Sequence, residues 1–328
     1  MSINHLSFNN VVTNLACSTD QGYIIYGLQP GLEKKLVYSP GGGVGITKML
    51  LKTNIIMLVG GGTTPFKSRD TLVLWDSSKK EIILEIDMKE QIKNVLLNKT
   101  HLVSVLDKKI CLFNWHGKCL ETKATYSNEK GLCVMNGNLD TIATLGTNKG
   151  EVSIWKYTTD TYKTIKAHLT NIEAIALNNN GSYVATASET GTLIRVFNVE
   201  TEQKEYEFRR GSQSAIVYDI CFSNDSKFLA CCSGNGTVHI WDIYKDPNTN
   251  KNTQSRLSGF KNYLPQYIGS QWNMKQLSLS NDNSKAICIF DENNDLHVAT
   301  YAGNYYKIAG RTGEFENITK GELHINNK

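Results

Sequence analysis

The stretch Gly236-Thr-Val-His-Ile-Trp241 is a short strand pattern that ends in an aromatic residue, and it recurs along the chain. Counted from Trp75, the closing aromatics fall at residues 113, 155, 197 and 241, which are spacings of 38, 42, 42 and 44 residues. Weaker copies stand at Gly22-Tyr-Ile-Ile-Tyr26 and Gly303-Asn-Tyr-Tyr-Lys-Ile308. Such a period is typical of repeats of about 40–45 residues in which four short strands form one unit.

This repeat predicts the fold. Seven units in 328 residues leave about 47 residues for each (328/7), which is enough for four strands and three turns. Alternating apolar runs split by Asn and Gly turns, as in 172–198, indicate antiparallel meanders. We therefore expect an all-β chain folded as a single seven-bladed β-propeller of WD-repeat type over residues 1–328. The sequence leaves open whether residues 5–13 pair into the last blade to close the ring.

Composition and charge exclude several classes of protein. With 40% hydrophobic and 20% charged residues the chain is not disordered, and 35 Lys+Arg against 31 Asp+Glu gives a net charge of only +4. We therefore expect no nucleic-acid function, and any anion site must come from local clustering. The most apolar stretch, 49–59, is short and interrupted by polar residues, so no membrane span is expected. None of the eight cysteines forms a C-x-x-C pair, which disfavours zinc.

Two adjacent arginines, Arg209 and Arg210, form the sharpest local feature. On an extended segment their side chains point in opposite directions, so one can serve the blade before and the other the blade after. A solvated pair at a strand end is the plainer interpretation of the dipeptide alone. Its surroundings favour function, because an arginine fork together with hydroxyl groups is a suitable site for phosphate.

Alignment of the two neighbouring repeats extends this pattern. Matching Ser188 with Ser233, an offset of 45 residues, sets Thr192 opposite Thr237 and His168 opposite Gln213, and matching Phe197 with Trp241 sets Arg195 opposite His239. Each repeat then offers hydroxyl groups, a basic or polar group and one arginine of the pair. Two similar phosphate pockets on either side of Arg209 and Arg210 are the expected result.

The motif Phe208-Arg209-Arg210-Gly211, between Gly191-Thr-Leu-Ile-Arg195 and Gly236-Thr-Val-His239, resembles the signature of the PROPPIN family. The glycine clusters at 41–45 and 58–62 support the resemblance, which is strongest to the small WIPI subgroup. The family consists of seven-bladed autophagy propellers that bind phosphatidylinositol 3-phosphate and phosphatidylinositol 3,5-bisphosphate. The resemblance implies one headgroup site with Arg209, Arg195, Ser188, Thr190, Thr192 and His168, and a second with Arg210, Ser233, Thr237, His239 and Gln213. For His168, a hydrogen bond within the repeat is an equally good interpretation.

The resemblance also implies a membrane-contacting loop in the sixth blade, where the polar insertion 244–265 breaks the spacing. A disordered loop is the plainer alternative. Apolar side chains there would enter the membrane interface and a lysine would meet anionic lipid. The expected membrane-contacting residues are Leu257, Phe260, Lys261, Tyr263 and Leu264.

We expect no catalysis and no cofactor. The glycine run at 41–48 lacks the Gly-Lys-Ser/Thr order of a phosphate loop, and no pair of carboxylates can be placed in one pocket. The resemblance implies a cytoplasmic adaptor, peripheral on autophagosome-precursor, endosomal or vacuolar membranes. It also implies a large lipid-transfer protein as partner, engaged through blades 1–3, a region that includes 14–20 and 63–70. The alternative is a WD-repeat scaffold that binds only proteins.

Overall fold

The computed structural model describes residues 2–136, 140–243, 271–279 and 282–325. All regular elements in these segments are strands. No helix among the described residues is long and apolar enough to cross a membrane.

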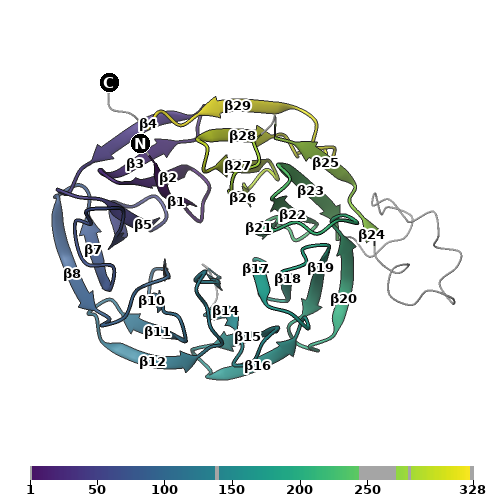
Figure 1. Ribbon diagram of the computed structural model, residues 1–328, viewed down its shortest axis with the longest axis horizontal. Coiled ribbons are helices and arrows are strands. Elements are labelled where there is room, and N and C mark those ends of the chain that lie inside the picture. Colours follow the sequence, from purple (N-terminus) through teal and green to yellow (C-terminus); the bar gives the residue numbers. More distant parts are fainter. Residues whose placement is uncertain (1, 137–139, 244–270, 280–281, 326–328) are drawn as a thin grey trace, which may run out of the picture. The chain divides into compact units, whose positions relative to one another are not determined.

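The strands form seven sheets, and each takes its four principal strands from one region of the chain (Figure 1). The first three sheets are β1–β4 (Ile3–Phe8, Asn14–Thr19, Gly22–Gly27, Glu33–Tyr38), β5–β8 (Val44–Met49, Ile55–Gly60, Thr71–Asp76, Glu81–Asp87) and β9–β12 (Asn94–Leu97, His101–Val105, Lys109–Asn114, Cys119–Ala124). The fourth and fifth are β13–β16 (Cys133–Met135, Thr141–Leu145, Glu151–Lys156, Thr161–Lys166) and β17–β20 (Ile172–Leu177, Tyr183–Ser188, Leu193–Asn198, Lys204–Arg209). The sixth and seventh are β21–β23 with β25 (Val217–Phe222, Phe228–Ser233, Thr237–Asp242, Lys275–Ser278) and β26–β29 (Ala286–Phe290, Leu296–Thr300, Asn304–Ile308, Ile318–Glu322).

These seven sheets are the blades of a β-propeller, which confirms the predicted all-β, seven-bladed fold class. The closing aromatics Trp75, Trp155, Phe197 and Trp241 all lie on the third strand of their blade. Each of these four side chains is buried, at most 7% exposed. The aromatic period therefore marks one strand per blade because each blade buries that strand in the same way.

The first strand does not pair into the last blade. β1 pairs antiparallel with β2 in the first blade, with Leu6 opposite Cys17, so that possible pairing of residues 5–13 is wrong. The seventh blade obtains all four strands from residues 286–322, and its third strand, β28, is the degenerate repeat that begins at Gly303. A fourth strand from the N-terminus is unnecessary because β29 supplies it.

By internal contacts the chain divides into two compact units. One unit comprises residues 1–133, 298–307 and 318–328, and a buried apolar cluster joins its blades 2 and 3 through side chains such as Met57, Leu74 and Phe113. The other comprises residues 134–297 and 308–317. All predicted headgroup residues belong to this second unit.

Blades 5 and 6 share one apolar cluster within the second unit. One face of blade 5, which includes Ala187, Ile194 and Phe208, packs against Val217 and Trp241 of blade 6, among others. Phe208 is fully buried and stacks on Trp241 with ring centroids 5.7 Å apart. The strand that carries the arginine pair is thus fixed by the packing of the residue directly before it.

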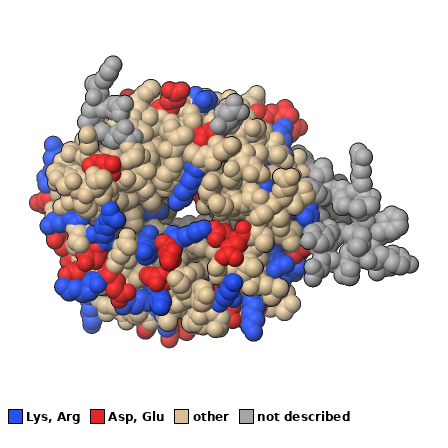
Figure 2. All heavy atoms as spheres, in the orientation of Figure 1, with Lys and Arg blue, Asp and Glu red and all other residues tan. Residues whose placement is uncertain are grey.

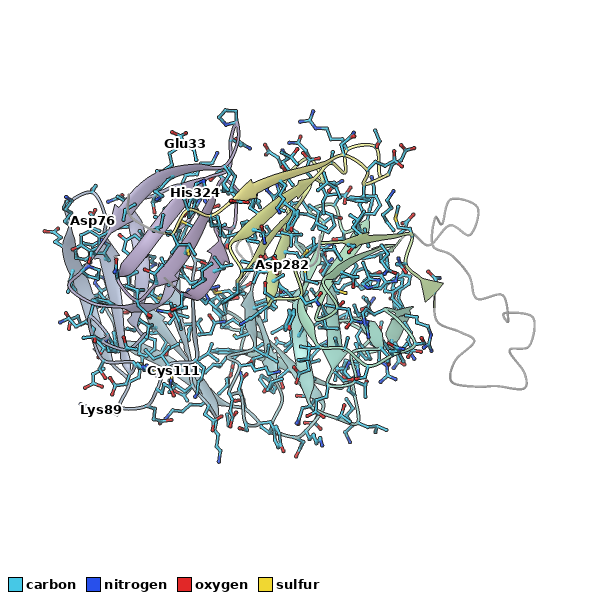
Figure 3. The ribbon with its side chains drawn as sticks, turned by 45° about the horizontal axis from the view of Figure 1, so that its top comes forward. Glu33, Asp76, Lys89, Cys111, Asp282 and His324 are labelled. Carbon is cyan, nitrogen blue, oxygen red and sulfur yellow. The ribbon has the colours of Figure 1, made fainter. Side chains whose placement is uncertain are left out.

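The turns between strands are held by side-chain oxygen atoms. Asp76, at the end of β7 (Figure 3), accepts hydrogen bonds from the main-chain NH and the hydroxyl of Ser78. Hydrogen bonds from Ser78 and Asn54 lower the pKa of Asp76 to about 2. A short polar side chain that binds the backbone two residues on is what stabilises such a turn.

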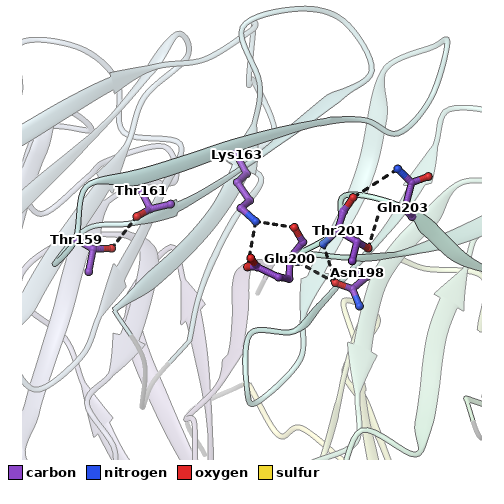
Figure 4. Close-up of polar contacts among 7 residues, drawn as sticks. All are labelled: Thr159, Thr161, Lys163, Asn198, Glu200, Thr201 and Gln203. Atoms are coloured by element: carbon purple, nitrogen blue, oxygen red, sulfur yellow. Dashed lines mark hydrogen bonds and ion pairs between the residues drawn. The ribbon is translucent and has the colours of Figure 1, made fainter.

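The hairpin between β19 and β20 lies at the end of β20 opposite to Arg209 and is tied to blade 4. Lys163 of β16 donates to the main-chain carbonyl of Glu200 at 2.7 Å and to its carboxylate at 3.1 Å (Figure 4). Asn198 accepts hydrogen bonds from the amides of Glu200 and Thr201 through its side-chain oxygen. These contacts fix the start of the strand that ends at Arg209.

Candidate functional site

Arg209 and Arg210 lie where blade 5 passes into blade 6. Arg209 is the last residue of β20 and stands opposite Leu193, while the amide of Arg210 donates to the carbonyl of Thr192 at 2.9 Å. Both side chains are buried, with 5% and 4% of their surface exposed. Because Phe208 packs toward blade 6, alternation along the strand directs Arg209 toward blade 4 and Arg210 toward blade 6. A buried guanidinium is costly without partners, which sets this pair apart from ordinary surface arginines.

The face of Arg209 carries a cluster of polar groups, here named the first cluster: His168, Thr186, Arg195, Glu207 and Arg209. The Nε2 atom of His168 lies 3.0 Å from the hydroxyl of Thr186. Arg195 donates from Nε to Glu207 at 3.0 Å and from Nη1 to the carbonyl oxygen of Ala167 at 2.7 Å. Two guanidinium groups, an imidazole, a carboxylate and a hydroxyl thus lie on one side of blade 5.

The environment of His168 keeps its ring neutral. Burial, followed by the positive charge of Arg195, lowers the pKa of His168 from 6.5 to about 4. Its hydrogen bond to Thr186 crosses from the end of blade 4 to blade 5, so the structural role that the sequence left open is present. A neutral imidazole can still donate one N–H to an anion.

The hydroxyl residues of the first repeat lie at the turn between β18 and β19. The Oγ atom of Ser188 is 3.1 Å from the Oγ1 atom of Thr190. Ser188 is buried, whereas Thr190 is exposed. Thr192 uses its carbonyl to hold the amide of Arg210, so its main chain contacts the second arginine.

The face of Arg210 carries the second cluster: Arg210, Ser233, Thr237 and His239. Hydroxyl groups of Ser233 and Thr237 are 2.7 Å apart, and the Thr237 hydroxyl lies 3.0 Å from Nε2 of His239. Arg210 donates from Nε to the carbonyl of Gly191 at 2.7 Å and from Nη2 to the carbonyl of Gln213. These carbonyls orient the guanidinium without neutralising its charge.

His239 matches His168 in its electrostatics. It is only 2% exposed, and burial, followed by the charge of Arg210, lowers its pKa from 6.5 to about 4. Its ring also stacks on Trp241 with centroids 5.8 Å apart. Each arginine of the pair therefore lies on the same side as a neutral histidine, of which His239 is buried and His168 half-buried.

The register corrects one step of the internal alignment. Thr186 pairs with Arg195 and Cys231 pairs with His239, so Arg195 and His239 are equivalent, at an offset of 44 residues (239 − 195). At that offset Thr237 corresponds to Leu193, and the alignment of Thr192 with Thr237 is wrong. The reason is the hairpin before the third strand, which is one residue shorter in blade 6.

Gln213 lies beside the second cluster, and the first cluster contains two residues that were not predicted, Thr186 and Glu207. Gln213 acts through its main-chain carbonyl on Arg210, while its residue is exposed. Thr186 and Glu207 were missed, although each stands two residues before a predicted site residue, Ser188 or Arg209, on the same strand. Period-2 alternation was therefore the signal that could have found them.

The predicted membrane loop, with Leu257, Phe260, Lys261, Tyr263 and Leu264, lies outside the described residues. The chain that follows it forms β24 (Gln271–Trp272), which pairs in parallel with β20, setting Gln271 opposite Phe208 and Trp272 opposite Arg209. β25 then becomes the outer strand of blade 6. The segment after the loop is thus bonded to the strand that carries Arg209.

Surface charge alone does not identify the site. Figure 2 shows Lys and Arg side chains interspersed with Asp and Glu on the visible face. No group of three or more His, Cys, Asp or Glu among the described residues is arranged to hold a metal ion. The candidate anion sites therefore depend on individual buried cations and their neighbours.

Comparisons with known proteins show the family and the fold of this chain. The model of the PROPPIN family matches residues 2–286. SVP1-like protein 2 of Schizosaccharomyces pombe is 30% identical over 299 residues, covering 87% of this chain and 81% of that protein. Autophagy-related protein 18 of Dictyostelium discoideum is 32% identical over 291 residues, covering 81% of this chain and 77% of that protein.

Solved structures share the fold. Hsv2 of Kluyveromyces lactis superposes with a TM-score of 0.78 at 22% identity, covering 98% of this chain and 99% of that one. A complex of KlAtg21 with the coiled coil of AgAtg16 matches with a TM-score of 0.72 at 22% identity, covering 98% and 100% of the two chains.

Proposed function

Because the chain belongs to the PROPPIN family of phosphoinositide-binding autophagy propellers, we propose that it seats two 3-phosphorylated inositol headgroups, one beside Arg209 and one beside Arg210. The ligands are phosphatidylinositol 3-phosphate and phosphatidylinositol 3,5-bisphosphate in a membrane. The observation that carries the proposal is the pair of buried arginines on opposite faces of one strand end, each on the same side as a neutral histidine, of which His239 is buried and His168 half-buried.

The first site consists of Arg209 and Arg195 with His168, Ser188, Thr190 and Thr192. Guanidinium groups present planar donors to phosphate oxygens, and hydroxyl groups add further hydrogen bonds. Ser188 and Thr190 bring their hydroxyls to 3.1 Å of each other at the turn beside this cluster. A phosphate there also offsets the cost of the buried Arg209 charge.

The second site consists of Arg210 with Ser233, Thr237, His239 and Gln213. The carbonyls of Gly191 and Gln213 fix the guanidinium before the ligand arrives, which limits the entropy lost on binding. Thr237 lies between Ser233 and His239 in one hydrogen-bonded chain. A phosphate that displaces one of these hydrogen bonds meets donor groups of Ser233, Thr237 and His239 that are already held in position.

Two weak sites on one molecule suit a membrane. A charge-assisted phosphate contact contributes about 1.5–3 kcal/mol. Once one headgroup is bound, the second site binds at a high effective concentration. The loop at 244–265 adds a third contact in this proposal, and the target membranes are autophagosome-precursor, endosomal or vacuolar.

The remaining blades recruit protein in this proposal. By family resemblance the partner is a large autophagy lipid-transfer protein, engaged through blades 1–3, which include residues 14–20 and 63–70. The family is one of binding propellers, so the proposed role is that of an adaptor between a marked membrane and this partner.

Vesicle flotation and calorimetry together test the lipid proposal. Wild type floats with vesicles that contain phosphatidylinositol 3-phosphate, and soluble inositol 1,3-bisphosphate titrates to two sites per chain. Arg209→Ala and Arg210→Ala each titrate to one site, and the double variant to none. Arg311→Ala removes an equal charge from an exposed position and serves as the matched control.

The contrary results are distinct. If the double variant floats as well as wild type, the lipid proposal is wrong, and the alternative of a scaffold that binds only proteins remains. Loss of all binding from one substitution means that the two arginines share a single site.

A further inference from the structure

Leu169 is 96% exposed, the most exposed of the large apolar side chains that the structure describes. It directly follows His168 on the connector 167–171 between β16 and β17. A leucine extended into water gains no burial energy in the isolated protein. It lies beside a residue of the proposed first headgroup site, so a membrane or a partner bound at that site could cover it.

Ile216 lies on the next connector, residues 210–216 between β20 and β21, directly before β21. It is 48% exposed and follows Arg210 by six residues (216 − 210). Each connector thus joins an exposed aliphatic side chain to a basic residue of one headgroup cluster. The segment 211–216 contains no charged residue.

Both connectors are fixed to the same turn, between β18 and β19. The amide of Glu189 donates to the carbonyl of Asn171 at 3.0 Å, and the Asn171 side chain donates to the Glu189 carboxylate. One residue further on, the carbonyl of Thr190 accepts the hydroxyl of Ser214 at 2.9 Å. The connectors that carry Leu169 and Ile216 are therefore both bonded to the edge of blade 5 that bears Ser188 and Thr190, while the carbonyl of Ile216 also accepts the amide of Gly234 in blade 6 at 2.8 Å.

Lipid is the partner that this arrangement fits. A phosphoinositide seated in either cluster holds the membrane surface at this edge, since its phosphates and its acyl chains belong to one molecule. Glu189 is the acidic residue of the turn and is engaged by Asn171, while Lys166, exposed at the end of β16, attracts anionic lipid. Apolar residues at the rim of basic sites are the usual composition of a membrane-contacting surface.

We propose that Leu169 and Ile216 enter the membrane interface when the headgroup sites are filled, as a lipid contact separate from the segment 244–265. This inference rests on the proposed function. It makes the edge of blade 5 itself part of the membrane surface. It also assigns each headgroup site its own aliphatic anchor.

Serine substitutions test the proposal against a matched control. We expect Leu169→Ser to weaken binding to vesicles containing phosphatidylinositol 3-phosphate about tenfold, since it removes one inserted leucine. We expect Ile216→Ser to weaken vesicle binding less, because about half of the Ile216 side chain is already covered in the isolated protein. Affinity for soluble inositol 1,3-bisphosphate stays unchanged in both. Ile83 is 47% exposed, nearly the same as Ile216, but it lies on β8 in the other unit. Ile83→Ser is therefore the control, and we expect it to leave vesicle binding unchanged.

A direct readout complements the affinities. A tryptophan at this position, Leu169→Trp, is expected to shift its emission to the blue on vesicle addition and to be quenched by lipids with brominated chains, relative to wild type. Unchanged vesicle affinity in Leu169→Ser, or an unquenched Leu169→Trp, overturns the proposal.

Two further outcomes are separable. A loss of soluble headgroup affinity in Leu169→Ser means that this side chain shapes the site rather than contacting lipid, which also overturns the proposal. If wild type binds neither vesicles nor soluble headgroup, the proposed function itself fails, and this inference with it.

Discussion

The Nε atom of Arg195 and the Oε2 atom of Glu207 lie 3.0 Å apart on neighbouring strands of blade 5. Arg195, which belongs to the first cluster, is thus already paired with the carboxylate of Glu207. Burial would raise the pKa of Glu207, but hydrogen bonds and charges from Lys204 and Arg195 outweigh it and lower the pKa. A headgroup phosphate must therefore approach an ionised carboxylate that competes for the same guanidinium.

Glu207→Gln is expected to strengthen headgroup binding at the first site. The substitution keeps a hydrogen-bond acceptor for Arg195 and removes the repulsion of the phosphate, which we place at about a fivefold gain in affinity for a partly screened pair. Titration of inositol 1,3-bisphosphate in the Arg210→Ala background isolates the first site.

Glu205→Gln is the control for this change, because Glu205 lies on the same strand but bonds Tyr183 and Asn198 instead. A weaker first site in Glu207→Gln would show that the carboxylate is needed to hold Arg195 in place.

Acid should destabilise the fold through histidines whose pKa is lowered, above all the buried His239. The pKa of His239 is about 4 in the folded protein against 6.5 for the free side chain, so the unfolded chain binds the proton more readily. Stability is therefore complete above pH 6.5 and falls as the pH drops toward 4, by at most about 3 kcal/mol for this group. His239→Gln is expected to flatten the dependence of the urea midpoint on pH in that window.

The pKa values of His168 and His101 are also lowered by burial and act in the same direction, so the slope should be reduced rather than abolished. His116→Gln, at an exposed position, serves as control and should keep the slope of wild type. An unchanged slope in His239→Gln would contradict the assignment.

Two glycines near the arginine pair, Gly191 and Gly211, should respond differently to replacement by alanine. Gly191 has a φ of +58°, and a Cβ there would lie 1.8 Å from the carbonyl oxygen of Ala215. Its own carbonyl accepts a hydrogen bond from Arg210. Gly191→Ala should therefore cost about 1–3 kcal/mol of stability and preferentially remove the second headgroup site.

Gly211→Ala is the matched test, because nothing lies within 4 Å of a Cβ at that position. It should leave stability and both titrated sites unchanged, although Gly211 belongs to the signature motif. Denaturation curves with calorimetric stoichiometry distinguish the two variants. Equal effects from both would argue against a steric cause.

Phe208 should be the residue of the motif that matters most for folding. It is fully buried, with its ring 5.7 Å from those of both Tyr206 and Trp241. Phe208→Ala should lower the free energy of unfolding by about 3–5 kcal/mol. The exposed Tyr162, changed to Ala, should lower it far less in the same urea experiment. Similar losses from both would mean that Phe208 is not a central core contact.

Local pattern predicted the blades and the motif. The closing aromatics at Trp75, Trp155, Phe197 and Trp241 each mark a third strand. They do so because the alternation of buried and exposed side chains along a strand depends only on a few adjacent residues. The same alternation indicated that Arg209 and Arg210 face different blades.

Long-range pairing decided the rest. The sequence left the place of residues 5–13 open, and it set Thr192 opposite Thr237 where the register sets Leu193 there. A hairpin shorter by one residue moves every later side chain by one place. The offsets of 45 at Ser188/Ser233 and 44 at Phe197/Trp241 indicate such a difference, but only the register places it before Thr237.

The small net charge of +4 left any anion site to local clustering, and the structure shows the two adjacent arginines buried in polar clusters. The sequence by itself determined the seven repeats, the all-β class and the adjacent arginines, since these depend on near neighbours. Only the tertiary structure showed that Glu207 pairs with Arg195, that His239 is neutral, and that carbonyls of Gly191 and Gln213 hold Arg210. Burial, charge proximity and main-chain contacts between distant segments exist only once the strands have paired.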